Sequence, residues 1–114
     1  MTQARRRLGA AGEDQAASWY EANGYEIVAR NWRCREGEVD LILLRGGLVV
    51  VCEVKTRASD AFGTPAEAVT PAKQRRLRTL AGLWLEATSF PHSGIRFDVA
   101  SILAGRLEII EAAF

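Results

Sequence analysis

The sequence predicts one α/β domain in which a mixed sheet is covered by helices. The predicted elements follow one another as helix, three strands, helix and two strands. The second and third strands are apolar on both faces along most of their length, and such strands are normally buried on both sides by helices. A strand meander followed by a helical crossover favours a mixed sheet. The length of 114 residues suffices for one core but not for two.

The N-terminal part is predicted to contain a basic tail, a helix and a strand. Residues 1–7 form a polar basic tail that we expect to be mobile, and residues 8–114 form the single domain. A helical pattern runs from about Leu8 to Asn23, and Gly24 favours its end. The inward stripe of this helix consists of Ala16, Ala17 and Tyr20. The segment from Tyr25 to Arg33 predicts the first strand.

A β-hairpin is predicted at the centre of the sequence. The turn residues Cys34 to Gly37 precede a second strand from about Glu38 to Arg45. Gly46-Gly47 is a strong signal for a two-residue hairpin, and the third strand runs from about Leu48 to Thr56. The loop from Ala58 to Thr70 is long for a small domain, and such loops often carry function or move.

A second helix and two further strands complete the predicted domain. Thr70 is a good N-cap and Pro71 a good first helical residue. The apolar stripe of this helix consists of Leu77, Leu80, Ala81 and Trp84. The last two strands, Ile95 to Leu103 and Leu107 to Glu111, are joined by Ala104-Gly105.

Composition and charge exclude several classes of protein. A hydrophobic fraction of 48% and a charged fraction of 25% are typical of an ordinary soluble globular protein. The net charge of +1 excludes a strongly basic or acidic protein, although basic residues cluster from Arg5 to Arg7, from Arg30 to Arg35 and from Lys73 to Arg78. Neither a secretory signal nor a membrane-spanning apolar run is evident, so we expect a cytoplasmic protein without a membrane partner.

The cysteines and the histidine do not indicate a disulfide framework or a zinc site. Cys34 and Cys52 are only two, and structural zinc sites usually have four ligands. Cys52 is predicted to be a small core residue. His92, the single histidine, falls in a predicted surface turn without a second His or Cys nearby.

Two carboxylates are predicted to meet at the end of the hairpin. Counting outward from the Gly-Gly turn places Asp40 opposite Glu53, and Glu38 opposite Lys55. Paired residues point to the same side of a sheet, and like charges directly opposite are destabilising. A divalent cation would compensate for this repulsion, and Mg²⁺ (or Mn²⁺) is commonly bound through one or two carboxylates. We therefore predict metal-dependent chemistry, acting on phosphate.

Lys55 shares a face with Glu53, because it lies two residues further along the same strand. An ammonium group there can orient or deprotonate an attacking water, or balance charge in the transition state. The alternative interpretation is a charged strand end held by ion pairs of Lys55 with Glu38 and Glu53.

Each helix adds a candidate to this site. Glu13 precedes Ala16 and Ala17 by three and four residues, so it shares their face and is either a third acidic group of the site or a first-turn residue favoured by the helix dipole. Gln74 leads the apolar stripe of the second helix and is predicted to point towards the carboxylates. Asp98, inside the fourth strand, is interpreted as a strand-end solvating group rather than as a member of the acidic cluster.

Several basic residues are candidates for contact with nucleic-acid phosphates, and the alternative is a solvated basic face. They are Arg57, Lys73, Arg75, Arg76 and the N-terminal arginines.

The motifs together resemble a known family. They are Gly12-Glu13, Gly37-Glu38-Val39-Asp40-Leu41-Ile42, Cys52-Glu53-Val54-Lys55-Thr56-Arg57 and the terminal Ala113-Phe114. This combination, covering the chain from about Leu8 to Phe114, is similar to the YraN-like family of small bacterial proteins. That family is placed in the PD-(D/E)xK nuclease superfamily, near archaeal Holliday-junction resolvases.

The resemblance implies a restriction-endonuclease-like fold with three α/β/α layers and a central mixed five-stranded sheet. It matches Asp40, Glu53 and Lys55 to the Asp, Glu and Lys of the superfamily. Glu13 matches the acidic residue in the first helix of resolvase-like members, and Gln74 more loosely matches a helical Gln. The sequence departs from the pattern at Val39, where the superfamily's name has Pro.

Three functional hypotheses follow from the residues and the resemblance. The leading one is a Mg²⁺-dependent, structure-selective DNA endonuclease. In it Asp40 and Glu53 bind metal and Lys55 positions the water. Glu13 is an additional metal ligand or an acid/base group, and Gln74 lines the site. The second is a non-catalytic nucleic-acid-binding module. The third is a protein-interaction subunit whose partner covers the apolar hairpin or the C-terminal strand. Resolvase-like proteins act as dimers, so a homodimer on branched DNA is an expectation by analogy.

Overall fold

The computed structural model describes residues 3–58 and 69–114, with side chains from residue 10 onwards. It confirms the predicted order of elements. The helices and strands are α1 (Gln3–Ala22), β1 (Glu26–Cys34), β2 (Gly37–Arg45), β3 (Leu48–Arg57), α2 (Pro71–Thr88), β4 (Gly94–Leu103) and β5 (Arg106–Ile110). Most of the predicted loop from Ala58 to Thr70, and the side chains of the N-terminal arginines, lie outside the described residues.

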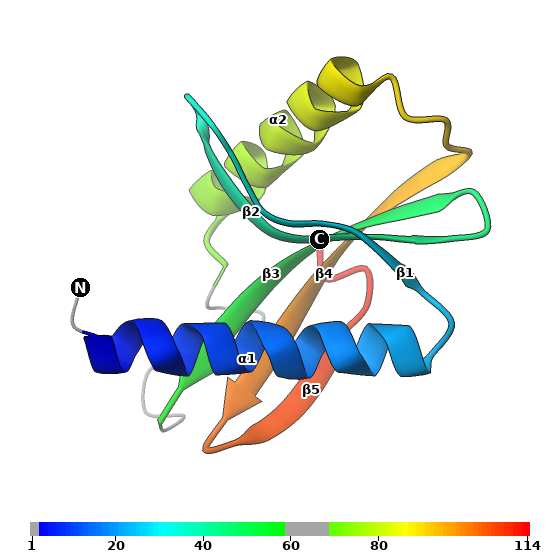
Figure 1. Ribbon diagram of the computed structural model, residues 1–114. Helices are drawn as coiled ribbons and strands as arrows, with labels where there is room; N and C mark the ends of the chain where they lie inside the picture. Colours follow the sequence, from blue (N-terminus) through cyan, green and yellow to red (C-terminus); the bar gives the residue numbers. More distant parts are fainter. Residues whose placement is uncertain (1–2, 59–68) are drawn as a thin grey trace.

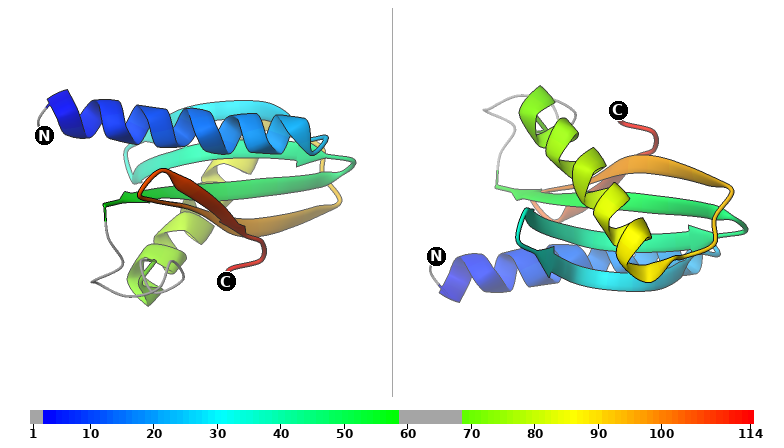
Figure 2. Two further views of the ribbon diagram at one scale, coloured as in Figure 1. Left: turned by 90° about the horizontal axis from the view of Figure 1, so that it is seen from below. Right: turned by 90° about the horizontal axis from the view of Figure 1, so that it is seen from above.

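The five strands form one mixed sheet, as predicted. The strand order is β1-β2-β3-β4-β5. Only β3 and β4 are parallel, and the other neighbours pair antiparallel. A parallel pair needs a crossover connection, and α2 lies on it. The two helices lie on opposite faces of the sheet (Figures 1 and 2).

The core has two parts because alternate strand residues point to opposite faces. The α1 stripe of Ala16, Ala17 and Tyr20 packs in one cluster with Leu41, Leu43, Val50 and Cys52. The α2 stripe packs in the other with Ile42, Val49 and Val51. The apolar hairpin is thus covered by helices on both faces, which removes the surface that the interaction-subunit hypothesis assigned to it.

The hairpin register is confirmed as far as the site. Arg45 pairs with Leu48, Leu44 with Val49 and Ile42 with Val51. The last pair is Leu41 with Cys52, so Asp40 and Glu53 lie just beyond it. Further out, β2 remains paired with β1 through Val39 and Glu38. The β1–β2 end therefore separates from β3 and curls towards α2 (Figure 1).

The N-terminus of α2 begins where the sequence predicts, and that of α1 begins earlier. The hydroxyl of Thr70 accepts a hydrogen bond from the backbone N–H of Lys73 at 3.2 Å, with Pro71 at the first helical position, as predicted. By contrast, α1 begins at Gln3 rather than near Leu8. Residues 3–7 are helical because Ala and Arg are strong helix formers and nothing in this stretch ends a helix.

Asp98 is a buried hub, and its interpretation as a strand-end solvating group was wrong. Its side chain is 0% exposed. It accepts hydrogen bonds from the Tyr20 hydroxyl at 2.7 Å, from the Arg96 guanidinium at 2.8 and 2.9 Å and from the Ala112 backbone N–H at 3.0 Å. These donors come from α1, β4 and the C-terminal segment, so one carboxylate connects three parts of the chain.

Gly12 sets the close approach of α1 to the sheet. It is buried, and a Cβ atom at this position would overlap Oγ1 of Thr56 on β3. We expect Gly12→Ala to destabilise the protein by about 1–2 kcal/mol, because this overlap outweighs the gain in helix propensity. Urea unfolding would measure the change.

Two further variants test this explanation of Gly12. Thr56→Ala removes the obstructing oxygen, which has no hydrogen-bond partner within the described chain, so it should restore most of the stability lost in Gly12→Ala. Gly82→Ala, in α2, meets nothing within 4 Å and should stabilise the protein. If the Gly12 and Gly82 variants behave alike, packing against Thr56 is not the reason for the glycine.

Cys52 and the histidine lie where the sequence predicts. Both cysteines are free, and Cys52 is buried in the core as predicted. His92 is exposed between α2 and β4. Neither described helix combines the length and apolar character needed to cross a bilayer.

Candidate functional site

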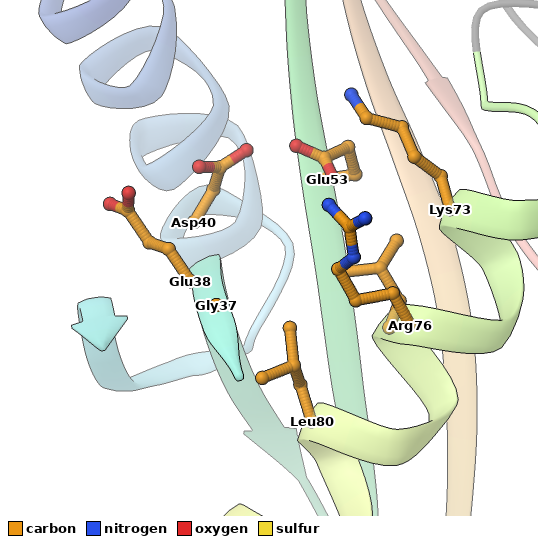
Figure 3. A pocket seen from close by; sticks show the side chains of 8 residues that line it. Gly37, Glu38, Asp40, Glu53, Lys73, Arg76 and Leu80 are labelled. Atoms are coloured by element: carbon orange, nitrogen blue, oxygen red, sulfur yellow. The ribbon is translucent and has the colours of Figure 1, made fainter. Parts of the chain in front are cut away.

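A pocket of about 220 Å³ opens where β2 separates from β3. One wall is built from the two strands and the other from α2 (Figure 3). The lining residues are Gly37, Glu38, Asp40, Glu53, Lys73, Arg76, Leu77 and Leu80. The pocket thus has carboxylates on the strand side and cations on the helix side.

Asp40 and Glu53 converge, as the predicted register requires. Asp40 lies where the β2–β3 ladder has ended, and its Oδ2 accepts a hydrogen bond from the backbone N–H of Val54 at 2.8 Å. The carboxylate therefore takes the place of a ladder acceptor. This bond fixes Asp40 beside Glu53, within hydrogen-bonding reach of it.

The pKa of Asp40 is raised from 3.8 to about 7. Burial is the largest cause, followed by the hydrogen bond and the negative charge of Glu53. The Val54 N–H and the positive charge of Lys55 act in the opposite direction and do not compensate. Burial and the neighbouring Glu53 therefore favour the protonated form of Asp40 up to about pH 7.

The structure does not support the alternative of a strand end held by ion pairs of Lys55. Glu38 instead lies opposite Arg33 of β1, with Arg33 Nε and Glu38 Oε2 3.5 Å apart. Among the described residues, no ion pair joins Lys55 to Glu38 or to Glu53. The curl of β2 towards α2 carries Glu38 away from β3 and explains this difference.

Lys55 lies next to Lys73 of α2. This close approach and burial lower the pKa of Lys73, while the negative charges of Glu53 and Asp40 act to raise it. Two lysine side chains in contact repel each other as cations. The basic side of the site therefore favours binding of an anion.

Glu13 lies on the α1 side of the sheet, near enough to Asp40 for their charges to interact. Its Oε2 lies 3.9 Å from Nη2 of Arg30, and its side chain also hydrogen-bonds to Asn31. Burial raises the pKa of Glu13, and the charges of Asp40 and Glu38 act in the same direction. Asn31 has a φ of 51°, a left-handed conformation that Asn tolerates better than most residues.

The predicted set of three carboxylate ligands is not assembled. Within residues 3–58 and 69–114, no group of three or more His, Cys, Asp and Glu side chains is arranged to hold a metal ion. Glu13 stays against Arg30 and Asn31 and does not line the pocket. Asp40 and Glu53 nevertheless suit Mg²⁺, which binds through one or two carboxylates and keeps several waters. A cation fits this donor set because two neighbouring carboxyl groups line the pocket and raise each other's cost of ionisation.

Of the other residues predicted for the site or for phosphate contact, some line the pocket and some do not. Gln74 donates from Nε2 to the carbonyl of Val69 at 3.0 Å and does not line the pocket. Arg75 is exposed, and Arg57 is partly buried at the end of β3. Lys73 and Arg76, predicted only as phosphate contacts, lie in the pocket itself.

The helical spacing of Lys73 and Arg76 could have indicated that both face the pocket. Lys73, Arg76, Leu77 and Leu80 follow one another at intervals of three, one and three, which places them on one face of α2. Gln74 leads a neighbouring row of the same stripe through Leu77 and Ala81. The choice between the rows depends on how α2 is rotated on the sheet.

Fold and pocket together define a small mixed α/β protein with a carboxylate pair facing a basic helix. The model of "Uncharacterised protein family UPF0102" matches residues 12–102, and the chain belongs to this family. This confirms the YraN-like family that the motifs indicated.

Related proteins cover almost the same length. A UPF0102 protein of Rhodococcus opacus is 55% identical over 98 residues, which are 86% of this chain and 83% of the relative. One of Symbiobacterium thermophilum is 49% identical over 114 residues, 96% of this chain and 97% of the relative. One of Mycolicibacterium vanbaalenii is 46% identical over 110 residues, 96% and 91% of the two chains. Their names state no activity.

Proposed function

We propose that this protein is a Mg²⁺-dependent DNA endonuclease of the PD-(D/E)xK type, with a restriction-endonuclease-like fold. The observation that carries the proposal is the convergence of Asp40 and Glu53 in a pocket that also contains Lys73 and Arg76. Lys55, two residues after Glu53, supplies the third group of the motif.

The roles of the residues follow from their chemistry. Asp40 and Glu53 would hold Mg²⁺ (or Mn²⁺), which lowers the pKa of bound water and polarises a phosphoryl oxygen. Lys55 orients the attacking water and balances negative charge that develops on the phosphate. Glu13, behind Asp40, acts as an additional acidic group. The Val54 N–H keeps the Asp40 carboxylate in position.

The chemistry of the pocket favours recognition of the DNA backbone rather than of bases. Its polar groups are carboxylates and cations, which contact phosphates and metal, and phosphate contacts carry no direct sequence information. We therefore propose a substrate distinguished by shape, such as a junction or flap. A homodimer would allow both strands of such a substrate to be cut symmetrically.

Cleavage assays with matched variants test this proposal. Purified protein is incubated with branched, flapped and linear DNA, with Mg²⁺, with Mn²⁺ or with chelator, beside Glu53→Gln and Lys55→Ala. We expect metal-dependent cleavage that both variants lose. Binding without cleavage under every metal would contradict the enzyme and favour a non-catalytic binding module. Absence of DNA binding at low salt would contradict both.

A further inference from the structure

The two walls of the pocket carry opposite charges without being joined by ion pairs. Figure 3 shows the Lys73 ammonium and the Arg76 guanidinium on α2 directed towards the carboxylate side. Among the described residues, none of the ion pairs links either cation to Glu38, Asp40 or Glu53. The cations and carboxylates therefore face each other across a space that a ligand can occupy.

Arg76 is held in place by the curled end of β2. A Cβ at Gly37 would lie 3.6 Å from Cδ of Arg76 and 3.4 Å from Cδ1 of Leu80, so the backbone of Gly37 rests against both side chains. The φ of Gly37 is +148°, a value that residues with a Cβ rarely adopt. The aliphatic stem of Arg76 packs on this glycine, while its guanidinium extends into the pocket (Figure 3).

The other arginines near this face of α2 have different surroundings. The guanidinium of Arg78 lies 4.8 Å from the ring centre of Phe97 and 5.6 Å from that of Phe114, where it packs on the C-terminal segment. Arg75 is exposed, as Arg76 is, but it does not line the pocket. Proximity on one helix therefore does not by itself bring a cation into the site.

We propose that Lys73 and Arg76 form a phosphate seat that binds the non-bridging oxygens of the phosphodiester to be cut. The seat rests on the proposed function and specifies how the substrate is held. The planar guanidinium of Arg76 can donate two parallel hydrogen bonds to a phosphate, and the ammonium of Lys73 adds a point charge. A phosphate between the walls also relieves the repulsion between Lys73 and Lys55.

Salt-dependent DNA binding in an Asp40→Asn background, where cleavage is blocked, tests the seat. We expect Arg76→Ala and Lys73→Ala each to weaken binding of a fluorescent DNA junction about tenfold to a hundredfold, the range for lost charge-assisted hydrogen bonds. Each should also reduce the slope of log affinity against log salt by about one. Arg76→Lys should recover only part of the affinity.

Arg75→Ala is the matched control, because it removes the same charge from the same helix outside the pocket. It should weaken binding much less than Arg76→Ala. Equal losses for the two variants, with the parent protein still binding DNA, would overturn the phosphate seat and leave the proposed enzyme standing. Thermal unfolding of every variant verifies that each is folded.

A second probe, inorganic phosphate, separates failure of the seat from failure of the proposed function. The seat predicts that phosphate raises the melting temperature of the Asp40→Asn protein and that Arg76→Ala removes this shift. That result without any DNA binding would keep the seat and overturn DNA as the substrate. If the protein neither binds DNA nor shows a phosphate-induced shift, both proposals are overturned.

Discussion

Asp40→Asn is expected to reduce Mg²⁺-dependent DNA cleavage by about a thousandfold or more and to stabilise the protein above neutral pH. The amide oxygen can still accept the hydrogen bond from Val54, and its NH₂ group can donate to Glu53. The variant therefore keeps the geometry of the pocket and removes the electrostatic conflict. It also removes a negatively charged oxygen ligand, which lowers the affinity for Mg²⁺.

The expected pH dependence follows from the raised pKa of Asp40. The pKa is about 7 in the folded protein and 3.8 ordinarily, so between these values the folded state binds a proton that the unfolded state has lost. The free energy of unfolding of the parent protein should therefore fall as pH rises through this window and reach its lower level above about pH 7. Asp40→Asn lacks this loss and should be more stable by about 1–4 kcal/mol at high pH.

Urea unfolding of both proteins at pH 5 and pH 8, without metal, measures this difference. Addition of Mg²⁺ at pH 8 should stabilise the parent protein and have little effect on Asp40→Asn. The same pH dependence in both proteins would show that the carboxyl pair is not the source of the instability. A variant as active as the parent would contradict the assignment of Asp40 to the site.

Asp98→Ala is expected to destabilise the protein by about 3–5 kcal/mol, the largest effect on stability that we predict. The substitution leaves Arg96 largely without its buried counter-charge, although Glu111 lies 3.8 Å from its Nη1. It also leaves the hydroxyl of Tyr20 and the N–H of Ala112 without their acceptor.

Two milder variants test the explanation of Asp98. Tyr20→Phe removes one of the four hydrogen bonds and should cost about 1 kcal/mol. Asp98→Asn keeps one acceptor oxygen, replaces the other with an NH₂ donor and removes the charge, so its effect should fall between those of Tyr20→Phe and Asp98→Ala. A loss below about 1 kcal/mol for Asp98→Ala would mean that the hub does not join the three segments energetically.

The hairpin shows what local sequence is sufficient to predict. The Gly46-Gly47 turn and the apolar strands on either side determine a register that the structure reproduces from Arg45–Leu48 to Leu41–Cys52. The same count brought Asp40 to Glu53, although their contact is made by side chains beyond the last ladder pair. The next pair predicted from this register was wrong, since Glu38 pairs with Arg33 and not with Lys55.

The predictions for Asp98 and for the pocket side of α2 were wrong because they depend on contacts between distant parts of the chain. Asp98 was misread because its partners are distant in sequence, with Tyr20 lying 78 residues earlier. On α2, the stripe of apolar residues was correct, but Gln74 was chosen in place of Lys73 and Arg76. Periodicity identifies a face about a third of the helix wide, and neighbouring rows within that face cannot be separated by it.

The sequence by itself determined the order of elements, the hairpin and the pairing of Asp40 with Glu53, because turn chemistry and side-chain alternation act over a few residues. Only the tertiary structure decided which cations face that pair and that Asp98 is a structural hub. The rotation of α2, the curl of β2 and the approach of α1 at Gly12 arise from packing between segments far apart in the chain. Such packing depends on the whole core, and no local pattern specifies it.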